Sequence, residues 1–293
     1  MRITTALLAP ALSVMGLSVM GLALSAGAAS AQSLEIRDAV ARVTVIPEAR
    51  SDIKVEILTA NGQLPLQVRG SGQKVTIDGN LGRRIRGCDG EGKAIAVRVA
   101  GVGKVTYAQM PQVVVRTPRD VRVASGGAVY GTIGRAGNVE LGNAGCGDWV
   151  IANVDGALSL SEAGSGDMRS GAAGRAKIRL AGSGDLYAGA IRGPVEVDLG
   201  GSGDVTVGSV NGMLDVKIAG SGDVEVKGGH ATAMTTSVAG SGSVTFDGVA
   251  DTLKVRVAGS GDVNVQQVTG EVSRSVLGSG ELRIGGREVA RRP

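Results

Sequence analysis

Residues 181–185 read AGSGD, and the same five letters recur at residues 219–223 and 258–262. Successive Gly-x-Gly corners lie 18 to 20 residues apart. The residues that follow the corners are Asp148, Asp167, Asp185, Asp204, Asp223, Ser243, Asp262 and Glu281. Eight copies at one nearly constant spacing indicate a repeat array. A degenerate ninth copy, ASGGAV, begins at residue 124.

Each copy alternates apolar and polar residues on both sides of its corner. The residue after the acidic position is apolar in every copy, the next is mostly polar, and an apolar residue usually follows. A second alternating stretch precedes the corner, as at residues 214–218, where Asp215 and Lys217 separate three aliphatic residues. This period of two predicts strands with one buried face. No stretch has sustained helical periodicity.

A unit of about 19 residues with two short strands cannot bury its own apolar face. Stacked copies can, with equivalent residues ~4.8 Å apart in a β-solenoid. The sequence therefore predicts an all-β fold whose core is a ladder of Val, Leu and Ile, in agreement with a content of only five aromatic residues among 293. Outward residues of neighbouring coils should then form ion pairs, Lys177 with Glu196 and Asp198 with both Arg179 and Lys217.

Residues 1–31 have the pattern of a secretory signal peptide, with a basic start, an apolar stretch at 7–24 and small residues before the cleavage position. We expect cleavage between Ala31 and Gln32, and an uncleaved anchor is the alternative. The chain is expected to be exported, whether periplasmic, secreted or at the cell surface, with no membrane span in its mature part.

Cys88 and Cys146 are the two cysteines of the chain. An oxidising compartment predicts a disulfide between them, contributing ~4 kcal/mol. Two unrelated buried thiols are the alternative.

Residues 32–117 lack the repeat but remain β-rich, with strands predicted at 43–46, 53–58, 75–77, 95–99 and 113–115. They form either irregular first coils with a cap, which we favour because a solenoid needs a covered end, or a separate β-domain.

Residues 118–286 form the regular solenoid, and residues 287–293 form a basic tail. Arg83, Arg84 and Arg86 could receive an anion or polysaccharide, or are solvated loop charges.

The glycine-rich corner is not a nucleotide loop. A Walker loop needs Lys and Ser/Thr before a helix, and a dinucleotide fingerprint needs a helix where this chain has a strand. Calcium is a stronger hypothesis, with Asp167, Asp185, Asp204, Asp223 and Asp262 as candidate ligands. One carboxylate per coil is sparse for an ion that takes six to eight oxygens. We therefore favour carboxylates that accept backbone N–H groups of their own or the next corner.

Catalytic residue patterns are scarce. His230 is the only histidine, and no nucleophile motif lies near it, so we expect an exposed loop residue and no enzymatic activity. A formal net charge of +4 with interspersed signs argues against a nucleic-acid partner. We expect no cofactor, calcium apart. Cleavage or binding of polysaccharide through stacked carboxylates and Arg is the alternative function, and a calcium-stabilised solenoid is another.

The repeats resemble the auto-transporter adhesin, head GIN domain family, exported bacterial proteins with GSGD-type corners between short Val-rich strands. The likeness spans residues 43–284 and is clearest from GCGD at 145–148 to GSGE at 278–281. It implies a single-stranded right-handed parallel β-helix and an adhesin-like or scaffold role in the cell envelope, with a cell-surface protein or polysaccharide as partner. It implies no catalytic residues.

Overall fold

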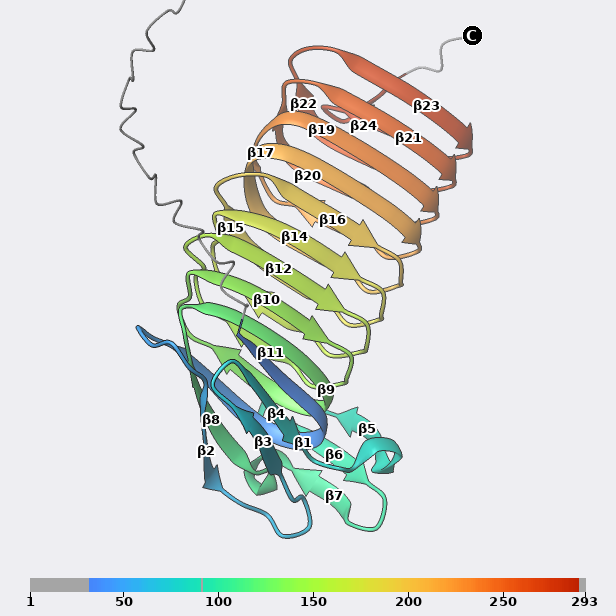
Figure 1. Ribbon diagram of the computed structural model, residues 1–293. Helices are drawn as coiled ribbons and strands as arrows, with labels where there is room; N and C mark the ends of the chain where they lie inside the picture. The colour runs from blue at the N-terminus through green and yellow to red at the C-terminus, as the bar shows by residue number, and fades with distance from the viewer. Residues whose placement is uncertain (1–31, 91, 290–293) are drawn as a thin grey trace, which may run out of the picture. The chain divides into compact units, whose positions relative to one another are not determined.

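The computed structural model describes residues 32–90 and 92–289. These residues form 25 β-strands, three 3-10 helices and no α-helix (Figure 1). The predicted signal peptide, with Ala31 on the N-terminal side of the cleavage position, lies outside the described residues.

The strands fall into an N-terminal group and a group of coils. The N-terminal group comprises β1 (Ser33–Pro47), β2 (Lys54–Thr59), β3 (Gln67–Ser71), β4 (Lys74–Asp78), β5 (Ile85–Asp89), β6 (Ala96–Val99), β7 (Gly103–Thr106) and β8 (Gln112–Thr117), with the 3-10 helices η1 (Gly82–Arg84), η2 (Gly92–Ala94) and η3 (Tyr107–Gln109). The coils comprise β9 (Asp120–Ile133), β10 (Asn138–Asn143), β11 (Trp149–Ile151), β12 (Ala157–Glu162), β13 (Met168–Ser170), β14 (Arg175–Leu180), β15 (Leu186–Ile191), β16 (Val195–Leu199), β17 (Val205–Gly220), β18 (Val224–Val226), β19 (Gly229–Gly240), β20 (Val244–Ala250), β21 (Leu253–Gly259), β22 (Val263–Val268), β23 (Val272–Gly278), β24 (Leu282–Ile284) and β25 (Arg287–Glu288).

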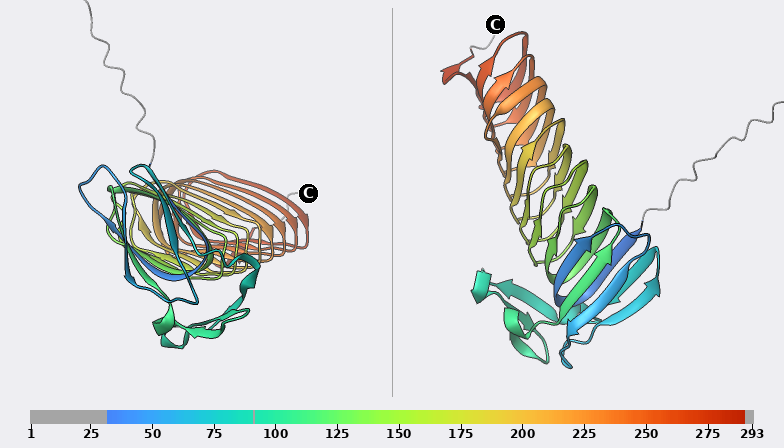
Figure 2. Two further views of the ribbon diagram at one scale, coloured as in Figure 1. Left: turned by 60° about the horizontal axis from the view of Figure 1, so that its bottom comes forward. Right: turned by 90° about the vertical axis from the view of Figure 1, so that its left-hand side faces the viewer.

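Two long parallel ladders run through the coils (Figures 1 and 2). A shorter parallel row at the other corner joins β15, β17, β19, β20 and β22. The pre-corner ladder joins β9, β10, β12, β14, β16, β17, β19, β21 and β23. The post-corner ladder joins β9, β11, β13, β15, β17, β18, β20, β22 and β24. Since β9 belongs to both ladders, the degenerate copy at residue 124 is a complete coil. The predicted all-β solenoid with a coil of about 19 residues is confirmed.

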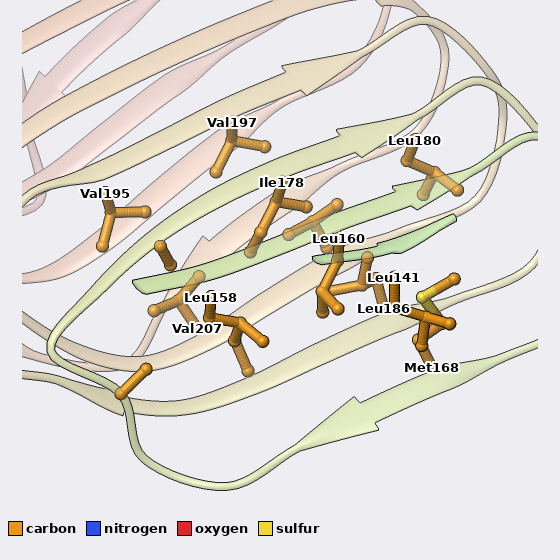
Figure 3. Close-up of a cluster of buried hydrophobic side chains, with 14 of the residues drawn as sticks. Leu141, Leu158, Leu160, Met168, Ile178, Leu180, Leu186, Val195, Val197 and Val207 are labelled. Atoms are coloured by element: carbon orange, nitrogen blue, oxygen red, sulfur yellow. The ribbon is translucent and has the colours of Figure 1, made fainter. Parts of the chain in front are cut away.

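The apolar residues of both ladders face inward and form one continuous core from Leu34 to Leu282. Figure 3 shows side chains of β12, β14 and β16 meeting those of β13 and β15. Two aromatic residues are also fully buried in this core, Trp149 and Phe246. Each fits because a glycine lies against it: a Cβ on Gly131 would be 2.3 Å from the Trp149 ring, and one on Gly248 would be 2.5 Å from the Phe246 ring.

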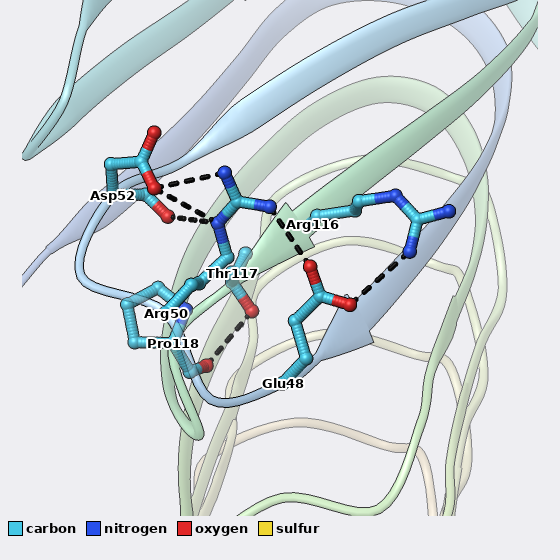
Figure 4. A network of polar contacts seen from close by, with 6 residues as sticks. All are labelled: Glu48, Arg50, Asp52, Arg116, Thr117 and Pro118. Carbon is cyan, nitrogen blue, oxygen red and sulfur yellow. Dashed lines mark hydrogen bonds and ion pairs between the residues drawn. The ribbon is translucent and has the colours of Figure 1, made fainter.

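The N-terminal strands extend the parallel ladders by further rungs. β1 pairs in parallel with β9, and also with β4 and β8. The chain then reverses, because β3 is antiparallel to β4 and β2 is antiparallel to β8. The turn between β1 and β2 is held by ion pairs in which Arg50 contacts Glu48 at 2.9 Å and Asp52 at 2.8 Å, while Arg116 of β8 contacts Glu48 at 3.2 Å (Figure 4).

Three N-terminal strands stand apart from the ladders. β5, β6 and β7 form an antiparallel sheet over a second, smaller core that includes Val97, Val105 and Tyr130. Cys88 of this sheet is joined by a disulfide to Cys146 at a solenoid corner, with 5.9 Å between their Cα atoms. The disulfide therefore attaches the β5–β7 sheet to the first regular coils.

The last described strand continues the fold beyond residue 286. β25 pairs with β24 in an antiparallel hairpin, so residues 287 and 288 belong to the sheet and not to a free tail. Residues 290–293 of the predicted tail lie outside the described residues.

Both glycines of each corner are required by the coil that precedes it. A Cβ on Gly182 would lie 1.9 Å from the carbonyl oxygen of Gly164, and one on Gly184 would lie 2.1 Å from that of Gly166. Equivalent contacts recur through the regular coils up to Gly278 and Gly280. The backbones of successive corners are therefore in direct contact. A side chain at either glycine would collide with backbone atoms of the preceding coil, which cannot move aside as a flexible side chain could.

Gly184→Ala should destabilise the protein by about 2–3 kcal/mol, because the added methyl group must displace backbone. Gly142→Ala, in β10, is the matched control: a Cβ there meets no atom within 4 Å. It should be neutral or slightly stabilising, since alanine restricts the unfolded chain. Urea unfolding of both variants measures the difference, and equal stabilities would contradict the stacking argument.

Candidate functional site

A column of carboxylates follows the second glycine of successive corners. In each case Oδ1 accepts a hydrogen bond from the backbone N–H of the equivalent residue in the next coil. The donor and acceptor are 2.8 Å apart from Asp185 to Asp167, 3.0 Å from Asp204 to Asp185 and 2.9 Å from Asp223 to Asp204. The column is therefore a chain of side-chain bridges between coils, and it offsets the repulsion that stacked acids would otherwise cause.

All five residues considered as calcium candidates lie in this column. Asp167, Asp185 and Asp204 bridge to the next Asp, Asp223 accepts the N–H of Ser243 at 2.7 Å, and Asp262 accepts that of Glu281 at 2.9 Å. One oxygen of each carboxylate is thus used by the fold. Among residues 32–90 and 92–289, no group of three or more His, Cys, Asp or Glu side chains is arranged to hold a metal ion.

A shallow groove runs beside the carboxylate column. Its first part, about 470 Å³, lies between Asp148, Asp167, Asp185 and Asp204 and the outward residues of β11, β13, β15 and β17. A second hollow of about 300 Å³ shares Asp204 and Thr206 and continues to Asp223 and Thr245. We call the two together the acidic groove. Its long axis follows the stacking direction of the coils.

Arg169 and Tyr187 occupy the middle of the acidic groove. They are partners in the parallel pairing of β13 with β15, and the Arg169 guanidinium carbon lies 5.2 Å from the centroid of the Tyr187 ring. This cation–π contact fixes a flat, amphipathic surface next to a row of hydrogen-bond acceptors. Both residues stand two positions after the corner Asp of their coil, where the alternation of the repeat directs side chains outward.

The outward residues of the pre-corner ladder pair among themselves, as predicted. The Lys177 ammonium lies 2.6 Å from the Glu196 carboxylate, and Asp198 lies 3.6 Å from Arg179 and 3.9 Å from Lys217. These exposed pairs contribute little energy individually. The charges on this face are largely neutralised by one another, which distinguishes it from the acidic groove.

One acid faces inward. Glu162 of β12 is 1% exposed, and the alternation pattern predicts an apolar residue at its position. Its Oε2 accepts a hydrogen bond from Asn143 Nδ2 at 2.9 Å, and its Oε1 accepts one from the Gly164 N–H at 2.6 Å. The pKa of Glu162 is nevertheless raised to about 7, mainly because the carboxyl is buried. The nearby charges of Asp167 and Asp148 contribute to the rise, and the two hydrogen bonds oppose it.

The groups needed for nucleophilic catalysis are not assembled within the described residues. Both cysteines are in the disulfide. His230 lies on β19, not in the loop expected from the sequence, with its Nε2 2.8 Å from Asp251 Oδ1. This pair belongs to another corner of the coil, and no hydrogen bond there links His230 to a hydroxyl or thiol.

Comparisons place this β-solenoid in a known family. The family model described as "Putative auto-transporter adhesin, head GIN domain" matches residues 106–229 and 214–287, and the chain belongs to that family. No curated protein matches it. Residues 32–90 and 92–289 include no helix with the length and apolar character needed to cross a bilayer.

Two solved structures are similar to the chain. One is a "Putative lipid binding protein" from Parabacteroides distasonis ATCC 8503, 17% identical, with a TM-score of 0.52, covering 87% of this chain and 92% of that one. The other is a "putative adhesin" from Bacteroides fragilis NCTC 9343, 13% identical, with a TM-score of 0.41 and the same coverage. The first likeness supports the fold alone.

Replacing Asp185 separates the effect of its hydrogen bond to the next coil from the effect of its negative charge. Asp185→Ala removes the acceptor of the Asp204 N–H and should cost about 1 kcal/mol. Asp185→Asn retains an acceptor oxygen and removes one charge, so its stability should equal or exceed that of the parent protein. Denaturant titration of the three proteins tests this, and an Asn variant as unstable as the Ala variant would refute the bridging role.

Glu162 should make stability depend on pH. An unfolded Glu loses its proton near pH 4.5, whereas folded Glu162 retains it to about pH 7, so the folded state binds more protons in between. Stability should therefore fall as the pH rises from about 4.5 to 7, by on the order of 3 kcal/mol. Glu162→Gln should abolish this decrease of the free energy of unfolding between pH 4.5 and 7. Unfolding measured at several pH values in both proteins gives the difference, and parallel curves would contradict it.

Proposed function

We propose that the chain is an exported, non-enzymatic binding module of the cell envelope, adhesin-like, acting in the periplasm or at the cell surface. The observation that carries the proposal is the acidic groove, a feature repeated along successive coils and centred on Arg169 and Tyr187. Membership of an adhesin-type family supports a binding role.

The form of the acidic groove favours an extended ligand. Its polar groups repeat with the rung spacing of a parallel sheet, about 4.8 Å, and the coils bring them into one line without inserted loops. Such a line of acceptors fits a chain that donates hydrogen bonds at regular intervals, and the Tyr187 ring offers an apolar face for one of its units. An envelope polysaccharide is the ligand class that we propose, presented on a cell surface.

The regularity of the coils also supports a role without catalysis. The same backbone corner recurs from Gly145 to Gly280, and its glycines leave no room for a side chain. The carboxylates beside it are engaged in bridging coils. A scaffold that holds one surface rigid over many rungs suits recognition of a repeating polymer.

Binding of the purified protein to polysaccharide fractions of the native envelope tests the proposal. Tyr187→Ala and Arg169→Ala should each weaken binding about tenfold, equivalent to about 1.4 kcal/mol. Arg256→Ala is the matched control, because Arg256 is also an exposed outward arginine, on β21 in the other ladder.

The control should bind like the parent protein. Unchanged binding by the Tyr187 and Arg169 variants would exclude the groove as the site. Shortening of the polysaccharide during incubation would instead favour the polysaccharide-cleaving alternative.

A further inference from the structure

Exposed basic residues gather on the β5–β7 sheet and on η1, which precedes it. Arg83 and Arg84 lie in η1, Arg86 in β5, Arg98 in β6 and Lys104 in β7, and all five are exposed. We propose that this basic surface docks the protein on a membrane whose headgroups are anionic phospholipids.

Three of the cations converge on the turn between β6 and β7. Arg98 and Lys104 are direct partners in the antiparallel pairing, and Arg84 Nε donates to the Ala100 carbonyl in the turn at 3.0 Å. Like charges placed opposite each other destabilise a sheet. Arg84 has a partner within the fold, but the placement of Lys104 opposite Arg98 is unfavourable unless an anionic partner is present.

Few acids neutralise these cations. Arg98 pairs with Asp89 at 3.2 Å. Arg83, Arg86 and Lys104 make no ion pair within the described ranges. The opposite face of the sheet supplies the packing, through Val97, Val99 and Val105, so the basic face is available without loss of the core.

The charge distribution of the whole chain favours a planar anionic surface over a small ion. Residues 32–117 contain 13 Lys and Arg against eight Asp and Glu, whereas residues 118–286 contain 14 against 18. The first segment is thus +5 and the second −4. An extended negative surface attracts the N-terminal end and repels the coils, so the field orients the molecule with the solenoid directed away from the membrane.

The disulfide holds the basic surface in place. Cys88 lies in β5, two residues from Arg86, and Cys146 lies at the corner of a regular coil. The sheet is also packed on Tyr130 of β9. The cations therefore lie on a sheet that is fixed to the solenoid. Docking on a membrane would then cost little conformational entropy of the backbone.

Co-sedimentation with vesicles tests the proposal. The protein should bind vesicles of phosphatidylglycerol mixed with phosphatidylcholine, should not bind vesicles of phosphatidylcholine alone, and should be released by high salt. Arg86→Gln combined with Lys104→Gln should lower the partition coefficient about 25-fold, from about 5-fold per cation near a surface.

The double variant Lys254→Gln with Arg256→Gln is the control, because it removes two exposed cations from β21 of the solenoid. It should leave the partition coefficient nearly unchanged. An equal loss in both variants would show that net charge alone drives binding, and no binding at low salt would likewise overturn the proposal. Binding to a soluble anionic polysaccharide without binding to vesicles would assign the surface to that polymer instead.

Retention of the Cys88–Cys146 disulfide and of the melting temperature shows that each variant is folded. A folded double variant that binds anionic vesicles like the parent protein refutes the assignment of this surface.

Discussion

Close stacking of backbone on backbone at each corner governs the rest of the structure. The carbonyl oxygen of one corner occupies the place where the next corner would have a side chain, as Gly164 does beneath Gly182. Only a chain that returns to the same point after 18 to 20 residues satisfies this constraint repeatedly. The near-constant spacing, the scarcity of insertions and the paired ladders follow from it.

The same stacking determines what the acids do. Asp in the corner is placed directly below the N–H of the next Asp, so its carboxylate completes a hydrogen-bond chain along the stack. Each of these aspartates thus uses one carboxylate oxygen to bridge neighbouring coils. The proposed binding role depends instead on two groups beside the column, the exposed Arg169 and the half-buried Tyr187.

Sequence periodicity predicted the regular coils well. In a solenoid, each residue pairs with the residue one repeat later, so the repeat spacing alone determines the strand register. Lys177 and Glu196 could be paired from that spacing alone, and the paired strands place them together. The pattern failed where residues are not repeated. β3, β5 and β7 were not predicted, because each is only four or five residues long, contains a glycine and buries at most one residue.

Inward polar residues were also beyond prediction. The alternation at Glu162 indicates only that its side chain points inward, and its hydrogen bond with Asn143 depends on two coils at once. The burial of Trp149 depends likewise on Gly131 in the preceding coil. Such complementary pairs are a property of neighbouring rungs, and a single copy of the repeat does not contain that information.

The reversal of strand direction at the N-terminal end has a consequence for self-association. A stack of parallel rungs can in principle be prolonged by another molecule, giving a filament. Here β2 and β3 run against the strands they cover, and both carry exposed charged residues such as Lys54 and Arg69. A second chain could not continue the parallel pairing at this end, because the outermost strands run in the opposite direction and carry charged side chains. The N-terminal end of the stack therefore does not favour growth of a filament.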